Sequence, residues 1–301
     1  MTTNTTHLLS DREIARIRAS ARRRRNIGRF FGYLFLTVFG LAFAFPLYWT
    51  MSSSLQTWQE LRSFYPQLLP SVPQWTNYVQ VFTLVPFARW MLNTVLIIGI
   101  SIPGSLITGT MAAYAFSRFR FWGRNVWFII MLGTMMIPAW VTLIPQYLLF
   151  HRLKLINTYV PLTIGSWLGG GAFTIFLLRQ FILGIPRDLA EAAHIDGAGP
   201  MRILVQVIVP LMKPALTTLG ILTFLGIWND FFGPFIYLNR RHMFTAAVGL
   251  RFFQTMPMEA NEPKDHLLMA AASITTIPVL IVFIFAQRYF VQGVVMSGLK
   301  L

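Results

Sequence analysis

Long apolar stretches dominate the chain, and short segments between them hold most of the charged residues. A helix needs about 20 apolar residues to cross a ~30 Å hydrocarbon core. Asp230 is the one Asp, Glu, Lys or Arg within the apolar stretches. The pattern predicts an all-α membrane protein with six transmembrane helices, at about 30 to 51, 91 to 116, 126 to 149, 159 to 178, 214 to 238 and 267 to 287.

The basic residues between these stretches predict the orientation. Lys and Arg gather in the cytoplasmic segments of membrane proteins. With both termini inside, the cytoplasmic segments hold 17 of the 25 Lys and Arg residues. We therefore expect cytoplasmic termini, a basic N-terminal segment (1–29), a six-span domain (30–301), and exterior loops at about 52 to 90 and 239 to 266.

The N-terminal segment has two interpretations. Arg22, Arg23, Arg24 and Arg25 favour a cytoplasmic anchor on anionic lipid headgroups. A cleaved signal peptide remains an alternative, because Ala42-Phe43-Ala44 follows an apolar run. The long leader and the continuation of the run to about Met51 favour retention.

Composition narrows the functional classes. Hydrophobic residues make up 55% of the chain and charged residues 12%, about half the charged fraction of a soluble domain. The chain has no cysteine, which excludes a disulfide scaffold and a thiol nucleophile. The net charge of +15 lies between membrane spans, so we expect a lipid bilayer and no nucleic acid as partner. The histidines have no metal-ligand spacing, so we expect no metal site.

A membrane protein of this kind usually moves a solute, and the chain has no obvious energy source. None of its lysines lies in the Gly-Lys-Ser/Thr run of a nucleotide-binding loop. Secondary transporters more often carry several ionisable groups at mid-membrane, whereas Asp230 stands alone. We expect the energy to come from another subunit; an ATP-independent channel or secondary transporter remains the alternative.

The cytoplasmic segment between the fourth and fifth spans predicts a short amphipathic helix. Pro186 suits a first helical position, Asp188 suits the positive end of the helix dipole, and Gly197 suits a left-handed C-terminal cap. These positions predict a helix from Pro186 to Asp196. At 100° per residue, one side is polar (Arg187, Glu191, His194), and Leu189, Ala192 and Ala193 lie opposite.

This segment also carries a family signature. Glu191-Ala192-Ala193, three residues, Gly197, nine residues, then Val207-Ile208-Val209-Pro210 resembles the E-A-A-x3-G-x9-I-x-L-P signature of ABC-importer permeases. Val207 and Val209 replace the usual Ile and Leu. Three further runs resemble the carbohydrate-uptake permeases, and most of all the smaller partner of the maltose type: Tyr114 to Phe121, Trp228 to Phe231, and Gln287 to Gly293 with Leu299-Lys300.

The resemblance implies a bundle with a cytoplasmic coupling helix, in the cell membrane of a prokaryote. It implies a second permease, two cytoplasmic ATPases and an extracellular solute-binding protein as partners. Because the ATPases would hydrolyse ATP, it implies no catalytic residues and no cofactor in this chain. The solute would be a sugar, an oligosaccharide or a glycerol phosphodiester. The residues implied for ATPase coupling are Arg187, Leu189, Glu191, Ala192, Ala193, His194, Gly197 and Pro210.

Two exterior features complete the expectations. Trp228, Asn229, Asp230 and Phe231 are candidates for the solute path, with Pro234 freeing the Asp230 carbonyl. An equally weighted alternative is a structural kink in which Asp230 pairs with Arg240 or Arg241. In maltose-type permeases the loop matching 251–264 reaches into the binding protein, so its tip would be Gln254, Met256, Pro257, Met258 and Glu259.

Overall fold

The computed structural model describes residues 11–255 and 264–298, with side chains described for 25–254 and 264–287. Every regular element within these ranges is helical, as the sequence predicts. Four helical segments are long and apolar enough to span a membrane: Arg25–Ser53, Phe87–Arg118, Val160–Leu183 and Asp265–Gln287. Two further pairs of helices pass the same criterion but are strongly bent, so six spans result if each pair is one crossing.

The first bent pair corrects the prediction of a continuous third span. Helix α5 (Arg124–Gly133) and a short 3-10 turn are followed by α6 (Ala139–Arg152), at 98° to the preceding segment. Pro138 has no N–H to donate, and it disfavours helical geometry at the residue before it. Ile137 accordingly has an extended backbone, with ψ 117°.

The fifth span also differs from the predicted 214 to 238. Helices α10 (Pro200–Ile203) and α11 (Val209–Leu211) flank a π-helical turn and meet α12 (Lys213–Trp228) at 78°. Helix α12 ends at Trp228, and α13 (Phe232–Tyr237) is a separate short helix. Asp230 therefore lies in a linker between helices, and Pro234 belongs to α13 rather than kinking a long span.

The helix of the fourth span is interrupted, which the sequence analysis did not predict. Helices α7 (Val160–Trp167) and α8 (Ala172–Leu183) are separated by three glycines with positive φ: Gly169, Gly170 and Gly171. A side chain is disfavoured at such φ values. The glycines also allow close approach to α4, because a Cβ on Gly170 would lie 3.1 Å from the Cα of Ser105.

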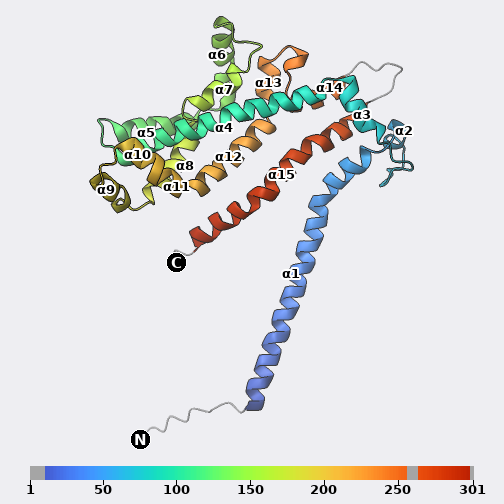
Figure 1. Cartoon of the computed structure of the whole chain (residues 1–301). Coiled ribbons are helices and arrows are strands. Elements are labelled where there is room, and N and C mark those ends of the chain that lie inside the picture. The colour runs from blue at the N-terminus through green and yellow to red at the C-terminus, as the bar shows by residue number, and fades with distance from the viewer. Residues whose placement is uncertain (1–10, 256–263, 299–301) are drawn as a thin grey trace.

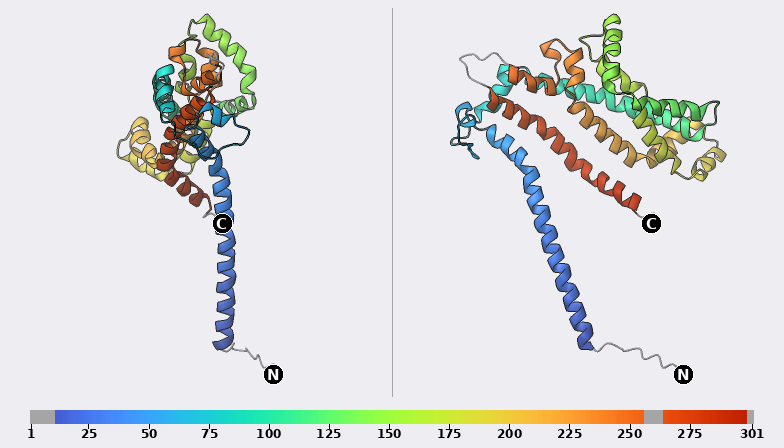
Figure 2. Two further views of the ribbon diagram at one scale, coloured as in Figure 1. Left: turned by 90° about the vertical axis from the view of Figure 1, so that its right-hand side faces the viewer. Right: turned by 180° about the vertical axis from the view of Figure 1, so that it is seen from behind.

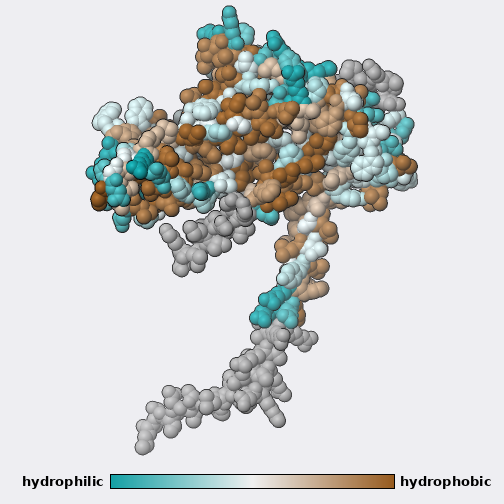
Figure 3. All heavy atoms as spheres, viewed as in Figure 1, coloured by the Kyte–Doolittle hydropathy of each residue, from teal (hydrophilic) through white to brown (hydrophobic). Residues whose placement is uncertain are grey.

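Helix α4 (Phe87–Arg118) is the centre of the bundle (Figure 1). One buried cluster joins its C-terminal half to α8 and to the α10–α12 segment, and includes Tyr114, Leu178, Ile182 and Ile208. A second cluster, at the other end, joins it to α3 (Thr76–Leu84), α14 (Ala246–Thr255) and α15 (Asp265–Gly298). Around these clusters, apolar residues cover the middle of the bundle, as Figure 3 shows.

Helix α1 (Asp11–Ser53) runs unbroken from the basic segment into the first span and diverges from the bundle, as Figure 2 shows from two sides. None of the most apolar 18-residue window of its span is buried within the chain. This helix is therefore left for lipid or another subunit to cover.

The segment after α1, which the sequence predicts as an exterior loop, contains short helices and is held by hydrogen bonds. It contains α2 (Trp58–Leu61) and α3. The Asn77 side-chain amide donates to the carbonyls of Ser54 and Gln56, at 2.9 and 3.0 Å. The Glu60 carboxylate accepts hydrogen bonds from the backbone N–H groups of Thr57 and Ser71, and these bonds lower its pKa. The same bonds connect two parts of the segment.

Candidate functional site

The predicted cytoplasmic helix is present as α9, slightly shorter than expected. It runs from Asp188 to Ile195, with Arg187 at its N-cap, so Pro186 lies outside it. Gly197 has φ 80°, and its N–H donates to the His194 carbonyl at 3.0 Å. The Ala198 N–H donates to the Ala193 carbonyl at 2.9 Å. This is the paired hydrogen bonding of a Schellman cap.

Ala192 and Ala193, which are adjacent in α9, face different surroundings. Ala193, with Ala190, packs against the buried cluster of α8 and α10, so it does not lie on the same face as Ala192, although the sequence places both opposite the polar side. Ala192 is exposed, and Leu189 and Ile195 are 45% and 85% exposed. The outer surface of α9 thus presents apolar side chains around a small residue.

The predicted polar side of α9 borders a pocket of about 330 Å³. Arg187, Glu191 and His194 line it on one side. Ala190 of α9 also lines the pocket, and the remaining walls come from the end of α4 and from α10: Tyr114, Arg118, Phe119, Pro200 and Ile203. Hydrophilic residues are prominent at this end of the molecule in Figure 3.

Arginine side chains connect α4 to the segment that leads into α9. One terminal nitrogen of Arg118 donates to the carbonyls of Ile182 and Ile185, at 3.0 and 2.7 Å. Arg179 donates to the Phe116 carbonyl at 3.2 Å, and its guanidinium lies 4.1 Å from the centre of the Phe128 ring. Arg118 was not singled out from the sequence, although it lies in the run from Tyr114 to Phe121 that resembles the carbohydrate-uptake permeases.

Pro210 lies at the joint between α9–α10 and the fifth span. The preceding residues, Leu204–Ile208, form a π-helical turn, and the Val209 N–H donates to the Leu204 carbonyl. Pro210 has no N–H for the next α-helical hydrogen bond. Ile208 and Met212 on either side are fully buried, so the joint is packed in the core.

The four candidate path residues do not form one exposed surface. Trp228 is 5% exposed, and its indole N–H donates to the Thr275 carbonyl at 3.1 Å. The Asn229 amide donates to the Leu225 carbonyl at 2.9 Å. Phe231 stacks on Phe235, with ring centres 5.0 Å apart. Trp228 is therefore a packed side chain rather than an open platform for a sugar.

Asp230 forms a local hydrogen bond rather than an ion pair. Its carboxylate accepts from the Gly233 N–H at 3.1 Å, at the start of α13. Asp230, Arg240 and Arg241 all have described side chains, and no ion pair is found between Asp230 and either arginine. The pairing with Arg240 or Arg241 that the sequence left open is therefore not formed.

A pocket of about 360 Å³ adjoins the end of α12. Trp228 and Asn229 line it, whereas Asp230 and Phe231 do not. Its other walls come from α14 and α15, where the polar lining residues are Thr275 and Thr276. Two threonines in an apolar span carry no distinctive sequence signal, which is why sequence reasoning missed them.

The segment 239–266, predicted as an exterior loop, contains a 3-10 turn at Arg241–Met243 and helix α14. Gln254 is exposed in the last turn of α14. The other four predicted tip residues, Met256 to Glu259, lie outside the described residues. The described part of the chain has no group of three or more His, Cys, Asp or Glu side chains that would suit a metal ion.

The chain is similar to known transport proteins, both to a family model and to individual relatives. Residues 105–296 match the family model described as binding-protein-dependent transport system inner membrane component. The chain is 34% identical to an arabinooligosaccharide transport permease of Halalkalibacterium halodurans, over 77% of this chain and 81% of that one. It is 32% identical to an sn-glycerol-3-phosphate transport permease of Pectobacterium atrosepticum, over 89% and 96% of the two chains.

Solved structures have the same fold. A chain of a bacterial ABC transporter involved in the import of the acidic polysaccharide alginate superposes with a TM-score of 0.79 at 28% identity, over 89% of this chain and 98% of that one. A chain from the alginate transporter in complex with its pentasaccharide-bound periplasmic protein gives a TM-score of 0.61 at 15% identity, over 88% and 94%. The second likeness concerns the fold alone.

Proposed function

The chain belongs to the binding-protein-dependent transport system inner membrane components, and from this membership we propose that it forms half of the translocation path for a sugar or related polar solute. As a transport permease subunit it would leave ATP hydrolysis to partner ATPases. We propose as its partners a second permease, two cytoplasmic ATPases and an extracellular solute-binding protein. Its relatives' names support a carbohydrate or a glycerol phosphate as the solute.

The observation that carries this proposal is the construction of α9. It is a short capped helix with an exposed outer face, and the chain leading into it is tied to α4 by Arg118. A displacement of α9 by a partner would therefore reach α4 and α8 directly. A channel has no need of such a helix.

Reconstituted uptake tests the proposal. We expect proteoliposomes containing the whole complex to take up solute only with ATP and the binding protein, and vanadate to stop uptake. Uptake without ATP would indicate a channel. Uptake that follows an ion gradient would indicate a secondary transporter.

The uncovered span of α1 supports the proposed second permease. The most apolar window of Arg25–Ser53 has no buried residue within this chain. Burying apolar surface has no hydrophobic driving force in lipid, so contact with another helix would rest on close packing. We propose that part of α1 packs against the second permease and the rest against lipid.

Accessibility labelling tests the proposed orientation, with both termini and α9 in the cytoplasm. Cysteine at Gly199, which is exposed beside α9, is expected to react only with reagents admitted to the cytoplasm. Cysteine at Ser71 is exposed in the opposite segment and is expected to react from outside. Ser117 is 2% exposed and unsuitable as a labelling site. Reaction of Gly199→Cys with an impermeant external reagent would reverse the orientation.

We propose that the pocket beside Trp228 and Asn229 is part of the solute path, with Asp230 at its margin. The buried indole of Trp228 would form its wall, and the exposed Asn229 and the nearby carboxylate would contact hydroxyl groups. Carboxylates at membrane depth are costly and usually functional. The competing role of Asp230 is structural, as the acceptor for the Gly233 N–H.

Asp230→Asn separates these roles, because the amide oxygen can still accept from Gly233. If Asp230 serves the path, we expect the KM for uptake to rise by ~2–10-fold, the value of one hydrogen bond, with assembly unchanged. Asp265→Asn, at the exposed ion pair with Arg62, is the matched control and is expected to leave KM unchanged. Reduced assembly with an unchanged KM would instead support the structural role.

We also propose that the end of α14 and the segment that follows it contact the binding protein, through Gln254, Met256, Pro257, Met258 and Glu259. Gln254 is exposed in the last helical turn before the segment, and the segment belongs to the exterior side in the proposed orientation. Transport that survives deletion of residues 255 to 260 would contradict this assignment.

A further inference from the structure

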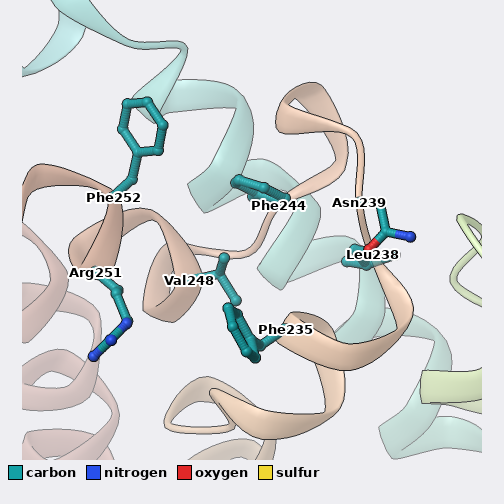
Figure 4. Close-up of a pocket in the computed structure, with 7 residues that line it drawn as sticks. All are labelled: Phe235, Leu238, Asn239, Phe244, Val248, Arg251 and Phe252. Carbon is teal, nitrogen blue, oxygen red and sulfur yellow. The ribbon is translucent and has the colours of Figure 1, made fainter. Parts of the chain in front are cut away.

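Partly or fully exposed aromatic side chains occur in two different settings. Figure 4 shows the first, a pocket of about 490 Å³ between α13 and α14 that Phe235 and Phe244 border. The second is the segment between α2 and α3, where Phe64 and Tyr65 are 90% and 79% exposed. Their rings meet edge to face, with centres 5.2 Å apart, and they line none of the pockets described above. These two rings therefore lie on an outer surface of the chain.

The segment that carries these rings is uncharged and apolar. It contains no Asp, Glu, Lys or Arg from Ser63 to Trp75. Leu68 and Leu69 are 55% and 69% exposed within the chain. We call Phe64, Tyr65, Leu68 and Leu69 together the 64–69 surface. Exposed apolar groups of this kind mark contact with a membrane or with another protein.

Hydrogen bonds to α1 fix the level of the 64–69 surface relative to the first span. The Tyr48 hydroxyl donates to the Leu68 carbonyl at 2.8 Å, and the Ser52 hydroxyl donates to the same carbonyl at 2.6 Å. Tyr48 follows Arg29, the last basic residue before the apolar run, by about 19 residues or ~29 Å of helix. That length matches the hydrocarbon core, and tyrosine is typical of the membrane interface. Leu68 therefore lies where α1 leaves the hydrocarbon core, and Figures 1 and 2 show the segment beside the last turns of α1.

The backbone of the segment suits a place beside lipid. Polar backbone groups near the hydrocarbon core need partners within the protein. The Leu68 carbonyl has two such donors, and the Gln67 carbonyl accepts from the Gln56 side-chain amide at 2.8 Å. Pro66 and Pro70 have no N–H that would need an acceptor. The carbonyls of Gln67 and Leu68 are thus paired inside the chain, while the apolar side chains of the segment remain exposed.

Charged groups mark the level at which the segment meets water. Arg62 pairs with Asp265, the first residue of α15, at 3.1 Å. The Glu60 carboxylate accepts from the Ser71 backbone N–H at 3.1 Å. The chain therefore leaves the level of the charged residues after Arg62, reaches the edge of the hydrocarbon core at Leu68, and returns at Ser71.

We propose that the 64–69 surface is a membrane anchor that inserts into the interfacial region of the bilayer at the Ser53 end of α1. Its partner is phospholipid of any headgroup charge, because the segment carries no charge of its own. In the proposed orientation this is the outer leaflet. The anchor holds the end of a span whose most apolar window is not buried within the chain. The inference requires that α1 crosses a membrane, and it does not depend on the solute or on the ATPases.

The cysteine-free chain allows the depth of single positions to be measured. Phe64→Cys and Leu69→Cys, each carrying a nitroxide spin label, are placed in the whole complex in phosphatidylcholine nanodiscs. Collision of the label with oxygen, which concentrates in the bilayer, is compared with its collision with a water-soluble nickel chelate. We expect oxygen to dominate at both positions, with an oxygen-to-nickel accessibility ratio several-fold higher than at a position that faces water.

Three further positions calibrate the measurement. Gln59→Cys is exposed in α2, next to the charged residue Glu60, and the nickel chelate is expected to dominate there. Leu41→Cys and Phe43→Cys are exposed on opposite faces of the first span, so at least one of them contacts lipid and gives the ratio for the hydrocarbon core. Adding phosphatidylglycerol to the nanodiscs is expected to change none of the ratios at the 64–69 surface.

Oxygen dominance at both Phe64→Cys and Leu69→Cys, with and without the binding protein, supports the anchor. Nickel dominance at either position places the surface in water and overturns the proposal. Low accessibility to both reagents also overturns it: the binding protein covers the surface if the loss appears only when that protein is added, and the second permease covers it otherwise. ATP-driven uptake enters none of these outcomes, so failure of the anchor leaves the proposed transport function standing.

Discussion

Glu191→Lys is expected to abolish ATP-driven uptake while the permease still inserts and pairs with its partner permease. Glu191 is exposed on α9 at the rim of the pocket shared with Arg118 and Arg187. By family resemblance its carboxylate meets a basic residue of the ATPase. A lysine at this position would repel the basic residue of the ATPase, and it would be the third cation at a pocket that Arg118 and Arg187 already line. We expect the free energy of docking to become less favourable by about 2–5 kcal/mol if the contact is buried on docking. Binding of the ATPase, measured by pull-down, is expected to fall with uptake.

Two further changes test whether the effect comes from α9 as a docking element. Asp196→Lys makes the same charge change at the C-terminal end of α9, where the helix dipole favours a cation, and we expect a smaller effect. Gly197→Val forces a β-branched residue to φ 80°, at about 1–2 kcal/mol, and we expect it to weaken ATPase binding. Gly197→Asn is its matched control, because asparagine tolerates this region. Undiminished ATPase binding and uptake in Glu191→Lys would show that α9 only rests at the membrane surface.

The second large effect is expected at the glycine break between α7 and α8. Gly170→Ala combines two costs. The positive φ of 67° costs about 1–2 kcal/mol, and the new Cβ would press on Ser105 of α4, where overpacking adds about 1–3 kcal/mol. We expect a clear drop in the midpoint of thermal unfolding of the purified complex in nanodiscs.

Neighbouring glycines separate the two costs. Gly171 also has positive φ, but a Cβ there would have no neighbour within 4 Å. Gly171→Ala therefore carries the free-energy cost of the backbone conformation without a steric cost. Gly165 lies in α7 with no neighbour within 4 Å, so Gly165→Ala should be neutral or slightly stabilising. Adding Ser105→Gly to Gly170→Ala should recover part of the steric cost, because it removes the Ser105 side chain but leaves the Ser105 Cα 3.1 Å from the new Cβ. Ser105→Gly alone is the reference, since a glycine within α4 is itself destabilising. Equal unfolding midpoints for Gly170→Ala and Gly165→Ala would contradict the expected close contact.

Local sequence patterns predicted the membrane spans and the C-terminal cap of α9, because both depend on residues that are close together in the chain. The number of apolar stretches agrees with six spans if each bent pair crosses once, because burial in lipid demands about 20 apolar residues per crossing. The cap of α9 was predicted at Gly197 and is found there, because few residues other than glycine readily adopt positive φ. The signature from Glu191 to Pro210 identified the family that residues 105–296 match.

Tertiary contacts decided what the same patterns left open. Apolar periodicity indicates that a stretch is buried, but it does not show whether lipid or protein covers it. For the same reason it did not distinguish Ala192, which is exposed, from Ala193, which packs against the buried cluster. The indole of Trp228 has its hydrogen-bond acceptor on α15, 47 residues away, so no local pattern revealed that its N–H is already satisfied. The pockets beside α14 likewise arise where segments distant in sequence meet. Helices, caps and membrane spans are set by neighbours along the chain, whereas the shape and charge of a cavity depend on which helices pack together and at what angle.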